Sequence, residues 1–204
     1  MLNLKETVGP AEWYQAFRRQ VRPARRADPL REAALAGRLG EWTAHLTGAV
    51  VAACEELGWA AVARGHLAEV LPVPRQEYLA VDVMAFPPGD RPGWRWPAAA
   101  FELENRPDLD RISYSIWKVG VVRCRWGAVF CYRREPEEIG LLLRGLTEGV
   151  MAALFISTGS TRRLNAPPAG RGGAYDPAAP APGGGHAQSG RGLPGRILQA
   201  VSVG

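Results

Sequence analysis

Three carboxylates on two predicted strands are the residues whose types and spacing point most directly to chemistry in this sequence of 204 residues. Asp82 lies within the apolar run 78–86, and Glu102 and Glu104 follow a series of apolar residues in the run 98–105. Successive side chains of a strand point to opposite faces, so Glu102 and Glu104 share one face. If the two strands pair as a hairpin, all three carboxylates converge on one side of a sheet.

Three carboxylates in a partly buried place need compensation, because like charges repel and raise one another's pKa. Carboxylate oxygens without a neighbouring cysteine or histidine are the donors that Mg²⁺ or Mn²⁺ prefers. The three carboxylates therefore predict a site for a divalent cation. The alternative interpretation is an ordinary polar face exposed to water. Aspartate is a poor strand residue, and its place inside an apolar run favours the metal site.

The elements that must position these residues are those of an α/β protein. Apolar residues at steps of three and four predict a helix over 39–57. The remaining elements follow from strand-favouring runs and from helical spacing. Strands are expected over 69–73, 78–86, 98–105 and 128–132. One helix is expected to begin near 108, and another to extend over 135–155.

Composition divides the chain into three segments: an N-terminal arm or helix over 1–37, an α/β domain over 38–158 and a tail over 159–204. The tail is rich in glycine, proline and alanine, so we expect it to be disordered. In the arm, Pro23 and Pro29 are expected to interrupt any helix.

The net charge of +5 belongs mostly to the tail. The stretch 159–196 contains one acidic residue, Asp176, and five arginines: Arg162, Arg163, Arg171, Arg191 and Arg196. This stretch therefore carries +4, which leaves +1 for the rest of the chain. The sequence pI near 9.5 is thus weak evidence for binding to nucleic acid.

The order of these elements resembles that of the PD-(D/E)xK nuclease superfamily. The residues that carry the resemblance are Val81–Val83, then Phe101–Asn105, then Ile112–Lys118, and it covers roughly 38–133. The resemblance implies a restriction-endonuclease-like core, with a mixed central sheet flanked by helices. Two features depart from the family pattern: no proline precedes the aspartate, and Glu104 stands where the family usually has lysine.

The resemblance also implies a function, metal-assisted hydrolysis of phosphodiesters in nucleic acid. Asp82 and Glu102 would hold Mg²⁺ or Mn²⁺, and Glu104 or Lys118 would orient or deprotonate the attacking water. Glu41, in the first half of the first helix of the domain, would add a further acid. The rival interpretation is a catalytically inactive module of the same fold that binds nucleic acid or a protein partner.

Two aromatic residues with basic neighbours form a further candidate feature. Trp94 and Trp96 alternate with arginines in a loop rich in proline and glycine, next to Arg91 and Arg95. Such a loop can stack on nucleobases. A hydrophobic cap over the core is the alternative interpretation, and both stay open.

Cysteine content and hydropathy bear on location. The three cysteines do not have the spacing of a zinc site. An odd number of cysteines without such spacing is typical of a reduced, cytoplasmic protein. The sequence contains no apolar stretch of the length that a membrane span needs. Its N-terminus has no apolar core after a basic start, so we expect no secretory signal.

Overall fold

The computed structural model describes residues 8–133, 136–157 and 197–203. They form, in chain order, α1 (Pro10–Val21), α2 (Ala24–Leu35), α3 (Leu39–Glu56), β1 (Ala60–Ala63), β2 (Val83–Phe86), β3 (Ala99–Leu103), α4 (Leu109–Val121), β4 (Trp126–Arg133), α5 (Pro136–Leu146), η2 (Thr147–Met151), α6 (Ala152–Ser157) and β5 (Ile197–Val203). This mixture of helices and strands confirms the predicted α/β class.

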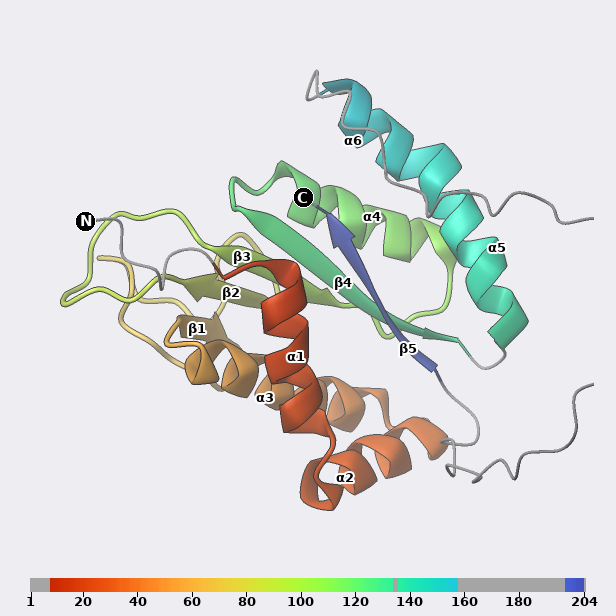
Figure 1. Ribbon diagram of the computed structural model, residues 1–204, viewed down its shortest axis with the longest axis horizontal. Helices are drawn as coiled ribbons and strands as arrows, with labels where there is room; N and C mark the ends of the chain where they lie inside the picture. Colours follow the sequence, from red (N-terminus) through yellow and green to blue (C-terminus); the bar gives the residue numbers. More distant parts are fainter. Residues whose placement is uncertain (1–7, 134–135, 158–196, 204) are drawn as a thin grey trace, which may run out of the picture.

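The four strands β1 to β4 form a mixed sheet whose spatial order follows the chain (Figure 1). β1 pairs with β2, and β2 with β3, in antiparallel orientation. β3 and β4 are parallel, which requires a crossover, and α4 supplies it. β5 pairs antiparallel with the other edge of β4. The predicted mixed sheet flanked by helices is therefore confirmed.

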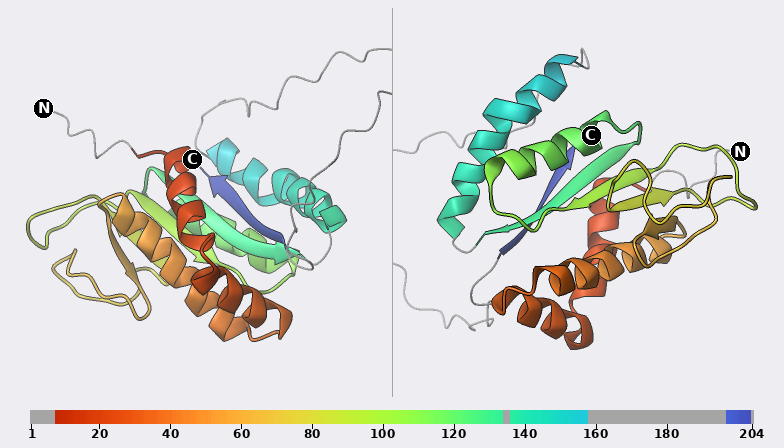
Figure 2. Two further views of the ribbon diagram at one scale, coloured as in Figure 1. Left: turned by 60° about the horizontal axis from the view of Figure 1, so that its bottom comes forward. Right: turned by 180° about the vertical axis from the view of Figure 1, so that it is seen from behind.

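The sheet lies between two layers of helices, which Figure 2 shows from two directions. α1, α2 and α3 cover one face, where the rings of Trp13 and Phe101 lie 4.7 Å apart. α4 and α5 cover the other face, where Ile116 belongs to the same buried cluster as Met84 and Val129. Side chains alternate along each strand, so each strand contributes to both cores.

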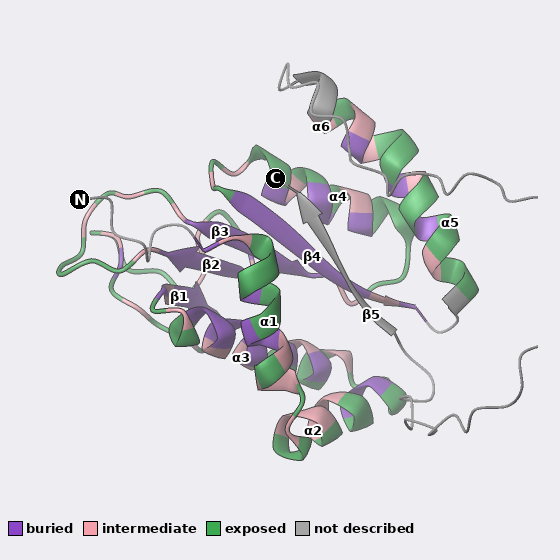
Figure 3. Ribbon diagram, in the orientation of Figure 1, coloured by how far each residue is buried: buried purple, intermediate pink, exposed green. Residues whose placement is uncertain are grey.

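Burial is continuous along β2 and β3, whereas the helices are buried on one side only (Figure 3). All residues of β2 and of β3 are buried, because both faces of the sheet are covered. This explains why the two strands read as uninterrupted apolar runs. Glu102 is the exception, a carboxylate within β3 that is only 4% exposed.

The N-terminal segment contains two helices that share the core with α3. Trp13 of α1 and Ala33 of α2 are buried in the same cluster as Leu46 of α3. Pro29 lies inside α2, so the prediction that it interrupts the helix is wrong. Proline removes one hydrogen bond within the helix. Burial of the following turn, at Ala33 and Ala34, holds α2 against α3 in spite of that loss.

The first two strands differ from their predicted positions. Residues 69–73 form no strand, and the first strand is β1, Ala60–Ala63. Alanine gives little strand signal, and this segment becomes a strand because its backbone pairs along β2. The strand predicted over 78–86 is confirmed only for Val83–Phe86.

The C-terminal part of the chain differs from its prediction in two ways. The helix predicted over 135–155 is divided by a kink at Gly149, whose φ of −95° and ψ of −105° are not helical. Residues 158–196 of the predicted disordered tail lie outside the described residues. At the end of this tail, Ile197–Val203 form β5, because β4 offers an open edge on which this short segment pairs.

Candidate functional site

Asp82 and Glu102 lie opposite each other at one end of the β2–β3 hairpin. The register pairs Val83 with Phe101, and continuing it by one residue places Asp82 opposite Glu102. The Asp82 amide donates a hydrogen bond to Oε1 of Glu102 at 3.2 Å. The Leu103 amide donates to Oδ2 of Asp82 at 2.8 Å. Each carboxylate is thus held by the backbone of the opposite strand, and the hairpin considered from the sequence is observed.

Lys118 of α4 contacts this site from the helix layer that covers the sheet. Its Nζ lies 2.8 Å from Oε2 of Glu102 and donates to the Ala80 carbonyl at 2.7 Å. The side chain of Glu102 is 5% exposed and that of Lys118 is 19% exposed, so the ion pair is largely buried. Breaking such a pair from one side leaves an uncompensated buried charge, which is strongly unfavourable.

The ionised forms of the Asp82 and Glu102 carboxylates are energetically unfavourable at this site. Burial, and then the neighbouring Asp82 carboxylate, raises the pKa of Glu102 to about 7, although Lys118 opposes this. Burial also raises the pKa of Asp82, although the hydrogen bond from Leu103 and the charge of Lys118 lower it. Buried carboxylates with raised pKa values favour the approach of a cation and are common at functional sites.

The turn before Asp82 has an unusual backbone. Leu79 and Ala80 have φ angles of 56° and 54°, in the left-handed region that non-glycine residues rarely adopt. This turn presents the Ala80 carbonyl to Lys118. Backbone strain of this kind concentrates at functional sites, where the surrounding structure holds it in place. The turn therefore positions the ammonium beside Glu102.

Glu104 lies just beyond the end of β3 and contacts the same helix. Ser115 of α4 donates to Oε2 of Glu104 at 3.3 Å, and the Arg106 amide donates to Oε1 at 2.9 Å. Glu104 is half-buried, and its charge contributes to the raised pKa of Asp82. Glu102 and Glu104 thus both face α4, as their spacing in the strand predicts.

Glu41 has no contact with these carboxylates within the described part of the chain. It is exposed and pairs with Arg38 at 2.8 Å. Thr43 instead links α3 to the site region, because Nδ2 of Asn105 donates to its Oγ1 at 3.1 Å. Residues two apart on a helix lie about 200° apart around the axis, so Glu41 points away from Asn105. The first half of α3 lies near the end of β3, but the structure does not bring Glu41 to the carboxylates.

The three acids do not form a complete metal cage. Among the residues that the structure describes, no group of three or more His, Cys, Asp or Glu side chains is arranged to hold a metal ion. Asp82 and Glu102 still fit a divalent cation of the Mg²⁺ type, which proteins often hold with one or two carboxylates, water and a substrate phosphate. Oδ1 of Asp82 accepts no hydrogen bond from the described residues, and it is not sealed from solvent.

Two polar residues of the site region were missed by the sequence analysis. Ser115 precedes Lys118 by three residues, so both lie on neighbouring positions of one helix face. That spacing is a signal that could have indicated Ser115. Thr43 gives no such signal, because its contact with Asn105 arises only when α3 packs against the sheet.

Comparison with known proteins gives no match: no family model, no curated protein and no solved structure is significantly similar to this chain. In the part of the chain that the structure describes, the helices are too short or too polar to span a membrane.

Proposed function

We propose that this protein is a divergent metal-dependent phosphodiesterase that acts on nucleic acid and has a restriction-endonuclease-like core. The observation that carries the proposal is the direct contact of Asp82, Glu102 and Lys118 at one end of the β2–β3 hairpin. An acid on one strand, an acid on the next and a lysine are the residue types that the PD-(D/E)xK resemblance implies. The order α3, β1, β2, β3, α4, β4 agrees with the order that it implies.

The origin of the lysine supports the same interpretation. Glu104 occupies the position at which the family usually has lysine. Lys118 supplies the ammonium from α4 instead, and it reaches the same carboxylate, Glu102. A lysine from the helix that follows the acidic strand is the variation that the resemblance allows.

Asp82 and Glu102 are the residues that would hold the cation, and the contacts of each leave it able to bind one. The cation, when bound, polarises the substrate phosphate and lowers the pKa of the attacking water. The amide of Leu103 fixes Oδ2 of Asp82 and leaves Oδ1 available. Lys118 favours the ionised form of Glu102, which is the form that binds metal.

Glu104 and Lys118 are the groups available for proton transfer and water orientation. Glu104 is half-buried and its orientation is set by Ser115 and by the amide of Arg106. A carboxylate held in this way can accept a hydrogen bond from the attacking water. Lys118, whose Nζ donates to the Ala80 carbonyl, lies beside the reacting centre.

A catalytically inactive module of the same fold, which binds nucleic acid or a protein partner, is the second candidate function. One observation favours it: both oxygens of Glu102 already have partners, the Asp82 amide and Lys118 Nζ. The ion pair then compensates the buried charge without any metal. In this case the carboxylates stabilise the hairpin and cleave nothing.

A cleavage assay distinguishes the two functions. Purified protein is incubated with labelled DNA and RNA in Mg²⁺, in Mn²⁺ and in EDTA. If the proposal holds, cleavage requires the metal, and Asp82→Ala and Glu102→Gln each lose about 100-fold or more in rate, as removal of catalytic groups usually does.

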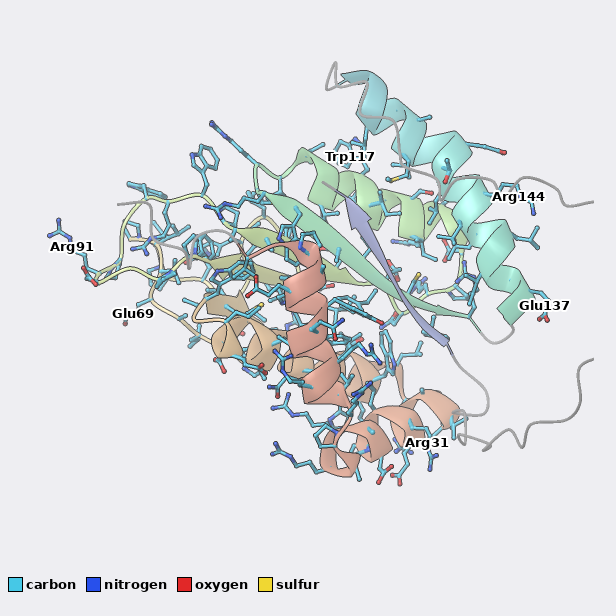
Figure 4. The ribbon with its side chains drawn as sticks, viewed as in Figure 1. Arg31, Glu69, Arg91, Trp117, Glu137 and Arg144 are labelled. Carbon is cyan, nitrogen blue, oxygen red and sulfur yellow. The ribbon has the colours of Figure 1, made fainter. Side chains whose placement is uncertain are left out.

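Two controls make the assay specific. Glu137→Gln removes an exposed carboxylate of α5, well away from the hairpin (Figure 4), and should leave the rate unchanged. Glu41→Ala should also change it little, because Glu41 pairs with Arg38. Cleavage that persists in Asp82→Ala would overturn the site assignment. Lack of cleavage by the wild-type protein on every substrate would favour the inactive module.

A further inference from the structure

A groove of about 350 Å³ lies beside the candidate site and has no role in the proposed mechanism. It is lined by Met84 and Phe86 of β2, by Leu79 in the turn before the site, and by Trp94 and Trp96 in the loop between β2 and β3. Its size is within the range of about 300–1,000 Å³ that is typical of sites for small molecules or parts of larger ligands.

The groove and the candidate site lie along the same strand. Asp82, Met84 and Phe86 alternate along the chain and share one side of β2. Two residues of a strand span about 7 Å, so the groove begins a short distance from the carboxylates. Leu79, which lines it, precedes Ala80, whose carbonyl holds Lys118. The groove is therefore within reach of a ligand whose phosphate lies at the site.

The aromatic residues of the groove are exposed to an unusual degree. Trp94 is 78% exposed and Trp96 is 63% exposed, whereas Trp13 and Trp42 are buried in the core. Burial of a large apolar side chain is favourable by about 1.5–3 kcal/mol, which these two residues do not gain. Exposed apolar groups that gather around a concave surface mark an interaction site.

The charges that line the groove are all positive. They belong to Arg75, Arg95 and Arg123, and none of the described acidic residues lines it. The guanidinium of Arg123 lies 4.5 Å from the ring centroid of Trp96, in a cation–π arrangement. Arg95 donates to the Pro87 carbonyl and to the Arg91 carbonyl, and so also closes the loop. The surface is complementary to a ligand that combines a planar ring with negative charge.

We propose that this groove binds an unpaired nucleobase of single-stranded nucleic acid, with the flanking phosphates on its arginines. A base that stacks on exposed tryptophan faces uses no hydrogen-bond pattern, so many sequences are accepted. A base inside a duplex cannot enter, because both of its faces are stacked. As an assignment of the substrate class, this inference rests on the proposed function. As a binding site, the groove does not depend on cleavage.

A protein segment is the competing occupant, since apolar side chains also fill apolar grooves. Charge separates the two: a nucleic acid brings one negative charge with every phosphate, which matches a lining of arginines without acids. The experiment therefore includes a probe that has phosphates and lacks bases.

The test is an equilibrium binding measurement by fluorescence anisotropy, with the full chain in EDTA so that no cleavage occurs. The probes are a labelled single-stranded DNA, the same length of abasic strand, and the duplex. We expect the single strand to bind most tightly. The double variant with Trp94→Ala and Trp96→Ala should weaken this binding by about 5- to 100-fold and leave the weak binding of the abasic strand unchanged.

A matched control uses another exposed tryptophan. Trp117, on the outer face of α4 (Figure 4), is 48% exposed and stacks on Tyr114, outside the groove. Trp117→Ala should bind the single strand as the wild-type protein does. If the double variant fails to fold, Arg123→Ala is compared with Arg91→Ala, whose side chain extends from the tip of the loop (Figure 4). Arg123→Ala should weaken binding of the single strand, and Arg91→Ala should not.

The outcomes separate the two proposals. Equal binding of the abasic strand, or of the duplex, or no effect of any groove variant would overturn the inference, and so would absence of binding. Metal-dependent cleavage with unaltered rates in the groove variants would overturn it while the proposed function stands. Base-dependent binding without cleavage in any metal would support the groove and count against the phosphodiesterase.

Discussion

Glu102 illustrates how a single residue couples burial to chemistry. Its side chain has lost nearly all contact with water and receives one hydrogen bond from the Asp82 amide and one ion pair from Lys118. These partners compensate the charge only in part, because burial and the Asp82 carboxylate still raise the pKa to about 7. Ionisation of Glu102 is therefore less favourable in the folded protein than in the unfolded chain.

The raised pKa predicts how stability changes with pH. In the unfolded chain Glu102 ionises near its ordinary value of 4.5, whereas in the folded protein it keeps its proton up to about 7. The folded state thus binds more protons between these values, and stability decreases as pH rises through them, by on the order of 3 kcal/mol. Asp82, whose pKa is also raised, acts in the same direction.

Urea denaturation in EDTA at several pH values measures this effect. The free energy of unfolding of the wild-type protein should fall between about pH 5 and pH 8. Glu102→Gln lacks the ionisable group, so its slope should be clearly smaller. Identical slopes for the two proteins would show that Glu102 is not the titrating group.

At the scale of elements, the site depends on how closely α4 lies on the sheet, because α4 provides both Lys118 and Ser115. Gly127 of β4 lies under this helix. A Cβ at Gly127 would come within 3.0 Å of Cβ of Val119 and 3.3 Å of the Ala100 carbonyl oxygen. Neither atom belongs to a flexible side-chain end, so the helix itself has to move.

Gly127→Ala should therefore be destabilising. We expect a loss of about 1–3 kcal/mol in the free energy of unfolding, as for other overpacked cores, together with weaker cleavage because Lys118 is displaced. Gly48→Ala in α3 is the control: a Cβ there meets nothing within 4 Å, and alanine favours the helix by about 0.5–1 kcal/mol. Urea denaturation of both variants measures the difference. A neutral Gly127→Ala would mean that α4 is free to adjust.

At the scale of the whole molecule, the sheet joins parts of the chain that are far apart in sequence. β5 pairs with β4 from Gly127 opposite Val203 to Arg133 opposite Ile197. β4 is thereby an interior strand, and its second edge has partners for its backbone groups. An unpaired edge strand leaves these groups open to solvent or to other chains.

Removal of residues 197–204 should expose this edge. Amide hydrogen exchange in β4 is expected to become faster in the shortened chain, because the hydrogen bonds to β5 are lost. Exchange in β1, at the opposite edge of the sheet, should change little and provides an internal reference. Unchanged protection of β4, measured by mass spectrometry, would contradict the pairing.

Local patterns in the sequence predicted most of the regular elements of the α/β domain and the face that Glu102 and Glu104 share. The helical spacing from Leu39 onward gave α3 almost to the residue, and the period of two placed Glu102 and Glu104 on one face. β1 escaped prediction because four small residues gain strand structure only from pairing with β2. Glu41 was assigned by analogy of position, which does not specify the direction of a side chain around the helix.

The sequence by itself determined an α/β chain with three acids in or beside two strands, because periodicity and residue type are properties of short segments. Only the tertiary structure decided that Lys118 pairs with Glu102, that Leu79 and Ala80 form a left-handed turn, and that residues 197–203 complete the sheet. These features depend on contacts between distant segments. The pKa of Glu102 depends on them as well, since burial and neighbouring charge exist only after the layers have packed.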